Sequence, residues 1–409
     1  MIGFDTLKEI ADCYPPSSPG YRAFEWILLA RRQKTQGHCP SLYTFLRQIR
    51  NDTLGDCCKA SDPRDMIFSL QGTHTLPLYL TPDYSLTVAE VFELAAIHCI
   101  ETTDGLHHLF NLCDAGYVGS SQLDVPLPSW VPDLTRRSLR PEVFRAPRHM
   151  SACRHRRFRF RDEWNPCGEL AVRGKVVDAI SYIGDQAFEE NISELANVPD
   201  CLHLSEMVEE IRASQMHVSG TVTEERVLNT ISVSDRHIPD HGDIFDDILS
   251  APSERPDGWP LYDTFWNAYQ RQLNLTAGYL EPRRHAELDA EREARKLLSW
   301  EQYRIKFPMF QLAPEDRQYS ADLGVLHGAL QGVAFRRIAT CADGALGLVP
   351  NTARVGDRIA IVHGCCHPVV LREAVEHGWS LVGLAYIEGY LSGQKCTWKK
   401  RDADTLVLV

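Results

Sequence analysis

The chain has 409 residues, enough to bury a large core and to hold two or three domains, and its hydrophobic (44%) and charged (24%) fractions are ordinary for a globular protein. A formal net charge of −12 disfavours general affinity for nucleic acid or for anionic membranes. No apolar run reaches the length of a membrane span, and the 13 cysteines include no CxxC pair. We therefore expect a cytoplasmic protein with reduced thiols.

The first part of the chain is predicted to be helical. Apolar residues recur on one side of Tyr21–Arg32 and Ser41–Arg50, and Ser41 suits a helix N-cap. The segment from Asp62 to Asp65 (DPRD) predicts a further helix start, because proline suits its first turn and acidic residues favour its dipole. Another helix is predicted over roughly Thr87–Ile100, and Leu127–Asp133 (LPSWVPD) is predicted to be an extended segment fixed by prolines.

The C-terminal part has the pattern of a β-sheet. Between Phe335 and Gly393, four short apolar runs are separated by turn residues, and Phe158–Arg161 and Glu169–Ile183 have the same character. These runs predict an α+β fold in which an antiparallel β-unit, either a small barrel or a sandwich, packs with surrounding helices. We divide the chain into a helical region (1–135), a basic segment with a β-hairpin (136–185), a helical region with a loop insertion (186–330) and a C-terminal β-region (331–409).

A basic stretch connects the first two regions. Ten arginines lie between Arg136 and Arg161, with Phe144, Phe158 and Phe160 among them. Such a pattern can bind RNA or a phosphorylated ligand, but we favour an amphipathic strand over Arg156–Asp162, with Phe158 and Phe160 facing inward and the arginines facing outward toward acidic partners. A small anionic ligand such as a carboxylate stays open, because arginine binds carboxylates through two hydrogen bonds.

Two clusters could suggest metal or nucleophile chemistry. The loop His237–Asp243 holds two histidines and two aspartates, but its spacing matches no defined metal site, and we expect a solvated acidic loop. Cys365, Cys366 and His367 are consecutive, so neighbouring side chains on a strand would face opposite sides. No GxSxG, P-loop or strand-linked GxGxxG motif occurs. We therefore expect no metal and no cofactor.

Three of these segments occur together in a known family. DPRD at 62–65, PDYS at 82–85 and LPSWVPD at 127–133 resemble the later part of the fungal heterokaryon-incompatibility (HET) domain and the region after it. Tyr262–Trp266 and the motifs of the C-terminal β-region continue the resemblance over most of residues 40–393. The β-rich start of that domain, with its Ser-Tyr-x-Trp-Gly type motif, is not found here, and Met1–Gln36 is too short and too helical to supply it.

The resemblance implies two different functions. The chain is similar in kind to stand-alone HET-like proteins of fungal biosynthetic clusters, one of which is associated with a norbornene-forming Diels–Alder step in sordarin-type biosynthesis. A cofactor-independent cyclase of this kind needs a shaped apolar pocket for a hydrophobic, terpenoid-like substrate and a donor that polarises its carbonyl group. The alternative is an incompatibility or cell-death regulator that acts through protein partners, which the missing N-terminal motif disfavours.

For the enzyme, we expect the pocket where the helices meet the β-unit, because such junctions leave concave apolar space. Candidate hydrogen-bond donors for a carbonyl or carboxylate are Tyr84, His363, Arg372 and Tyr386. Candidate substrate-binding aromatics are Trp130, Trp379 and Tyr390. The competing interpretation is that these aromatics fill the core and that Arg372 is an ordinary surface residue.

Overall fold

The computed structural model describes separate parts of the chain between residues 41 and 409. The described residues are 41–50, 60–72, 80–103, 105–113, 117–118, 121, 123, 126–138, 151–158, 168–185, 210–211, 213–222, 226, 230, 335–375 and 377–409. The predicted helix at Tyr21–Arg32, the loop His237–Asp243 and the aromatic motif Tyr262–Trp266 lie outside them.

Four α-helices in the described residues precede the sheet. They are α3 (Leu42–Arg50), α4 (Asp65–Phe68, continued by the 3-10 turn η1, Ser69–Gly72), α5 (Val88–Thr102) and α6 (Leu106–Cys113). Helix α5 begins with a capping box, in which the Thr87 hydroxyl accepts from the Glu90 amide at 3.2 Å and the Glu90 carboxylate accepts from the Thr87 amide at 2.6 Å. The helices expected at Ser41–Arg50 and Thr87–Ile100 are thereby confirmed.

The strands form one large, mostly antiparallel sheet and one small pair. Strands β1 (Tyr117–Val118) and β2 (Arg137–Ser138) make the small pair. The sheet of eight strands has the order β10-β8-β7-β6-β3-β4-β5-β9. Its members are β3 (Leu170–Ile183), β4 (Arg336–Cys341), β5 (Leu346–Pro350), β6 (Arg358–Val362), β7 (Val369–Glu373), β8 (Trp379–Leu384), β9 (Tyr386–Ile387) and β10 (Asp404–Leu408). The predicted α+β fold is confirmed.

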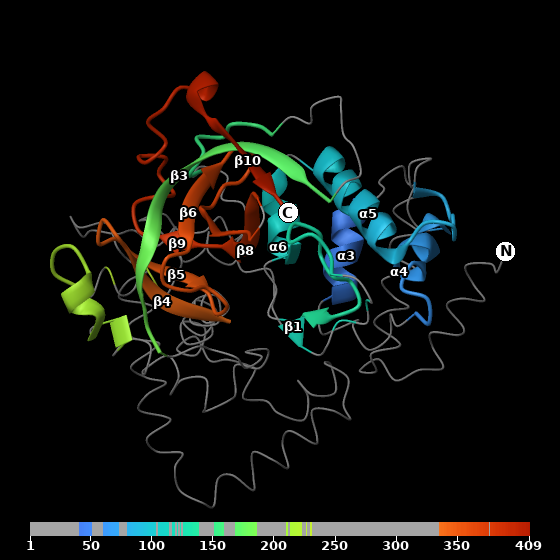
Figure 1. Ribbon diagram of the computed structural model, residues 1–409, viewed down its shortest axis with the longest axis horizontal. Coiled ribbons are helices and arrows are strands. Elements are labelled where there is room, and N and C mark those ends of the chain that lie inside the picture. The colour runs from blue at the N-terminus through green and yellow to red at the C-terminus, as the bar shows by residue number, and fades with distance from the viewer. Residues whose placement is uncertain are drawn as a thin grey trace, which may run out of the picture.

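Strand β3 connects the parts of this sheet, because it pairs with three other strands along its 14 residues. Its first part pairs with β10, its middle with β6 and its end with β4. Since β10 also reaches β8, the strands β3, β6, β7, β8 and β10 make a nearly closed ring. Figure 1 shows β3 as a long curved ribbon that arches over β6 and β10, with α3, α4 and α5 to one side.

The two faces of the strands build different cores. One face joins the helices in a large cluster that includes Phe92, Phe110, Trp130 and Tyr386. A second, smaller cluster lies on the other face around Ile180, Val349, Ile359, Val370 and Tyr390. Alternate residues of a strand point to opposite faces, which explains why Val370 belongs to one cluster and Leu371 to the other.

The basic stretch differs from expectation where it is described. Residues 156–158 are irregular rather than part of a strand. The Arg156 guanidinium donates to the Trp398 carbonyl at 2.5 Å and lies 5.7 Å from the centre of its ring. Arg154 donates to the Gly393 carbonyl at 3.0 Å. Arg156 therefore binds a carbonyl and a ring of the C-terminal segment instead of facing outward toward acidic partners, and the exposed Arg154 also attaches the stretch to that segment.

None of the helices in the described part of the chain has both the length and the apolar character that crossing a membrane requires.

Candidate functional site

A cavity of about 380 Å³ lies between the extended segment 126–136 and the ends of strands β5, β7 and β8. This is near the lower limit of the volumes, roughly 300–1,000 Å³, that small-molecule sites usually have. Apolar parts of the wall come from Leu123, Leu127, Val131, Phe335, Leu381 and Val382, with three prolines. Polar parts come from Ser129, Asp133, Arg136, Asn351, Thr352, Arg372 and Ser380. The wall suits a ligand that has both an apolar body and a polar group.

The extended segment is attached firmly to the sheet through Ser129. Its hydroxyl accepts from the Leu381 amide at 2.8 Å and donates to the backbone oxygen of Val409 at 2.5 Å. The next residue, Trp130, is fully buried, and its indole N–H donates to the Gly168 carbonyl at 3.0 Å. The prolines on both sides of Trp130 predict that it packs between the helical part and the β-unit, and its place in the core shared by helices and strands confirms this prediction. One wall of the cavity is therefore fixed by hydrogen bonds and by packing.

Arg372, on β7, is a charged hydrogen-bond donor with a fixed position in the wall. Its Nε donates to Asp357 Oδ1 at 2.9 Å, and its Nη2 donates to Asp357 Oδ2 at 2.8 Å and to the Thr352 carbonyl at 2.9 Å. The Asp357 side chain is 4% exposed and that of Arg372 is 31% exposed. The hydrogen bonds to Asp357 raise the pKa of Arg372, so the guanidinium stays charged.

The same contacts leave part of the guanidinium available. Within the described residues, Nη1 of Arg372 has no hydrogen-bond acceptor, while Nε and Nη2 are both engaged. Arginine can donate five hydrogens in one plane. Because Asp357 and Thr352 already fix that plane, a ligand oxygen would meet a donor that needs little reorganisation.

The other predicted donors lie away from this cavity. Tyr84 is 54% exposed and donates to Asp65 beside α4. Tyr386 is fully buried in the large core. His363 lies in the turn after β6, where its Nε2 is 3.2 Å from Arg156 Nη1, and burial, reinforced by Arg156, lowers its pKa to about 4.

The predicted aromatics are also dispersed. Trp130 stands between two residues of the cavity wall, Ser129 and Val131, and Trp379 precedes a third, Ser380. Tyr390 is fully buried, and its hydroxyl donates to Asp178 at 3.0 Å. Of the seven predicted site residues, the described structure therefore places Arg372 in the cavity wall, two tryptophans next to it, and the rest elsewhere.

Sequence reasoning missed the partners that fix Arg372. Strands β6 and β7 pair with Arg358 opposite Leu371, and continuing this register places Asp357 opposite Arg372. Opposite charges at facing positions of a short hairpin were therefore a usable signal. The contribution of Ser129 was less accessible, because its partners Leu381 and Val409 are more than 250 residues away.

Comparison of the chain with protein-family models, with curated proteins and with solved structures found no match.

Proposed function

We propose that this protein binds a small, largely apolar molecule in the 380 Å³ cavity and accelerates its cyclisation without a cofactor. The observation that carries the proposal is the Arg372 guanidinium, which Asp357 and Thr352 hold in the cavity wall. The resemblance to HET-like proteins of biosynthetic clusters supports a terpenoid-like substrate.

The proposed reaction is an intramolecular Diels–Alder addition. Two carbon–carbon σ bonds form while three π bonds become one, so atoms and electrons balance within the substrate and no proton, oxidant or nucleophile is needed. The protein has only to hold the diene and the alkene at a reacting distance and in the right orientation. A wall of prolines and branched aliphatic residues, anchored by Ser129 and Trp130, is suited to that task.

Arg372 would act on a carbonyl or carboxylate conjugated to the reacting alkene. A hydrogen bond from Nη1 withdraws electron density from the alkene, and this interaction strengthens as the transition state forms. One such donor contributes roughly 2–4 kcal/mol, which corresponds to about one and a half to three orders of magnitude in rate.

The test uses a synthetic terpenoid chain that carries a conjugated diene and an α,β-unsaturated carbonyl. Because the product is an isomer of the substrate, conversion is followed as a new chromatographic peak of unchanged mass. We expect the wild-type protein to accelerate it over buffer, and the double variant R372M/D357N to lose most of this acceleration. The second substitution removes the buried Asp357 charge that would otherwise be left without its partner.

Arg358→Met is the matched control, because Arg358 is a partly exposed arginine that pairs with Glu373 at 3.6 Å and lies outside the cavity wall. It should keep the wild-type rate, and EDTA should leave the rate unchanged. No acceleration by the wild-type protein would reject the cyclase and favour the regulator expected from the same resemblance. Full acceleration by the double variant would reject the role of Arg372.

A further inference from the structure

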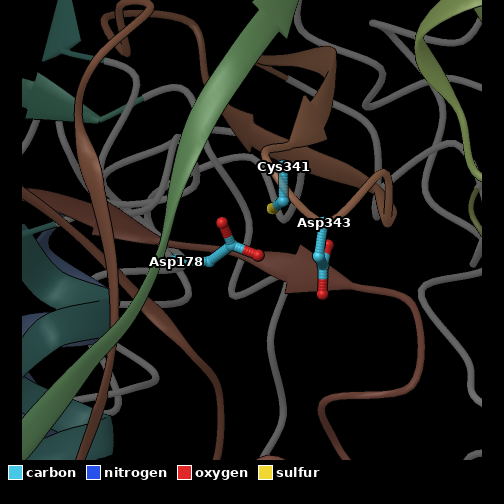
Figure 2. Close-up of side chains that lie close together, drawn as sticks. All are labelled: Asp178, Cys341 and Asp343. Atoms are coloured by element: carbon cyan, nitrogen blue, oxygen red, sulfur yellow. The ribbon is translucent and has the colours of Figure 1, made fainter.

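A second group of polar side chains lies at the other end of β4 from the cavity. Asp178 of β3, Cys341 at the end of β4 and Asp343 in the following turn each present one ligand atom, and these atoms lie within 4.8 Å of one another. Figure 2 shows Asp178 reaching from β3 toward the Cys341 sulfur and the Asp343 carboxylate. Phe335 and Pro350, which line the cavity, lie at the start of β4 instead.

The Cys341 thiol is the unusual member of this group. It is 1% exposed and makes no hydrogen bond within the described residues, although two carboxylates stand close to it. Its sulfur and one oxygen of each carboxylate lie within 4.8 Å of one another, so the thiol is buried against two hard ligand atoms. A ligand set of sulfur and carboxylate oxygens binds soft or borderline divalent metals in preference to calcium and magnesium.

The surrounding contacts hold the two carboxylates in place. Asp178 Oδ1 accepts from the amides of Ala179 at 2.8 Å and Ala342 at 3.2 Å. The buried Tyr390 hydroxyl lies 3.0 Å from Asp178 Oδ2 and 3.3 Å from Asp343 Oδ2. Metal ligands are commonly oriented by hydrogen bonds of this kind from a second layer of residues.

One cation already interacts with the group. The Lys395 ammonium is 2.5 Å from Asp343 Oδ2, and the two side chains are 43% and 34% exposed. A single ammonium balances only one of the two carboxylate charges. Because Lys395 and Asp343 reach the solvent, the ammonium can move away and a metal ion can enter from the same side.

We propose that Asp178, Cys341 and Asp343 form a binding site for a divalent metal of the zinc class. The metal takes the thiolate of Cys341 and one oxygen from each aspartate, the thiol proton passes to solvent, and the Lys395 ammonium leaves Asp343. Zn–O and Zn–S bonds of roughly 2.0–2.3 Å require only small side-chain rotations from the present separation. Three protein ligands leave a fourth position for water.

The site is separate from the cavity of the proposed reaction, and metal binding there would stabilise the fold. It connects β3 to the β4–β5 turn, which are also joined by the hydrogen bond from the Ala342 amide to the Ala179 carbonyl at 2.9 Å. Metal binding to the folded chain should therefore raise its stability by mass action. The cyclase proposal is not needed for this inference, since stability and spectra are measured without substrate.

The test is titration of the full chain with Co²⁺, whose bond to a thiolate gives a charge-transfer absorption in the near ultraviolet. We expect one equivalent to produce this band, Zn²⁺ to remove it by displacement, and Cys341→Ser to abolish it. Cys396→Ser is the control, because Cys396 is also buried and is not one of the three ligands. Asp343→Asn, at a partly exposed position, should weaken binding at least tenfold.

A variant of Lys395 distinguishes a metal site from a carboxylate cluster that binds no metal. If the ammonium and the metal compete for Asp343, Lys395→Met should tighten Co²⁺ binding, and the melting temperature should rise more on addition of Zn²⁺. No thiolate band at one equivalent, or an equal band in the Cys341→Ser variant, would overturn the proposal. So would unchanged or weaker binding by the Lys395→Met variant.

Discussion

Trp130 anchors the extended segment by burial, whereas Ser129 anchors it to the sheet by hydrogen bonds. Trp130→Ala should lower the free energy of unfolding by about 3–5 kcal/mol, because it removes a fully buried indole and leaves the Gly168 carbonyl without its donor. Urea unfolding measures the change. Trp379→Ala, at a partly exposed tryptophan, should have a smaller effect. Equal losses for the two variants would contradict the importance of Trp130.

At single residues, the sequence predicted burial better than it predicted contacts. Two prolines around Trp130 in a helix-to-strand connection pointed correctly to a buried tryptophan. The sequence pattern favours a carboxylate such as Asp83 or Asp133 as the partner of Arg64, but this arginine binds Asp62 and the carbonyls of Tyr84 and Leu86. Long side chains reach several acceptors within a few residues, so the choice among them depends on backbone geometry that the pattern of residue types does not contain.

Gly174 is the point at which β3 changes partners, because it faces Asp404 of β10 on one side and Val362 of β6 on the other. A Cβ at this position would lie 2.5 Å from the Ile361 carbonyl oxygen, which belongs to the backbone and cannot rotate away. Gly174→Val should therefore reduce the free energy of unfolding by roughly 1–3 kcal/mol or more.

The control for this variant is Ala171→Val, at an exposed position of the same strand, which should leave stability nearly unchanged because valine suits a strand. Thermal unfolding of the two variants, followed by circular dichroism, provides the comparison. If both melt at the wild-type temperature, the close approach of β3 and β6 at Gly174 is not a constraint on the fold.

The strands of the C-terminal region were predictable, and their arrangement was less so. Short apolar runs between glycine-containing turns identified β4 to β8 because antiparallel neighbours along the chain leave a local signature. The ring was not predictable in detail, because its closure depends on β3 meeting strands more than 150 residues later. The cavity could be expected at the junction of helices and sheet, but most of its predicted lining residues lie elsewhere.

The stability of the whole molecule should depend on pH through its buried histidines. Burial lowers the pKa of His363 to about 4, and it lowers the pKa of His367, which stacks on His107 at 5.1 Å, well below its usual value. An unfolded histidine titrates near pH 6.5. Below that pH the unfolded chain takes up protons that the folded chain excludes, so the free energy of unfolding falls.

The expected slope is about 1.4 kcal/mol per pH unit for each such histidine, between about pH 6.5 and about pH 4 for His363. Above pH 6.5 both histidines are neutral in either state and contribute no pH dependence. His363→Gln should reduce the slope, as measured by urea unfolding at several pH values. His377→Gln, at an exposed position, should not. An unchanged slope for the His363 variant would refute this account.

The pairing of β3 with β10 has a consequence for biosynthesis. Leu170 faces Leu408, so the strand pair that closes the ring joins residues that leave the ribosome at widely separated times. Helices α3 to α6 and β3 emerge long before β4 to β10, and during that interval the apolar side chains of β3 lack their partners in the sheet. In nascent chains the 14-residue strand β3 therefore lacks its partners in the sheet until β4 to β10 have also emerged, which makes β3 a segment where chaperones and aggregation would compete.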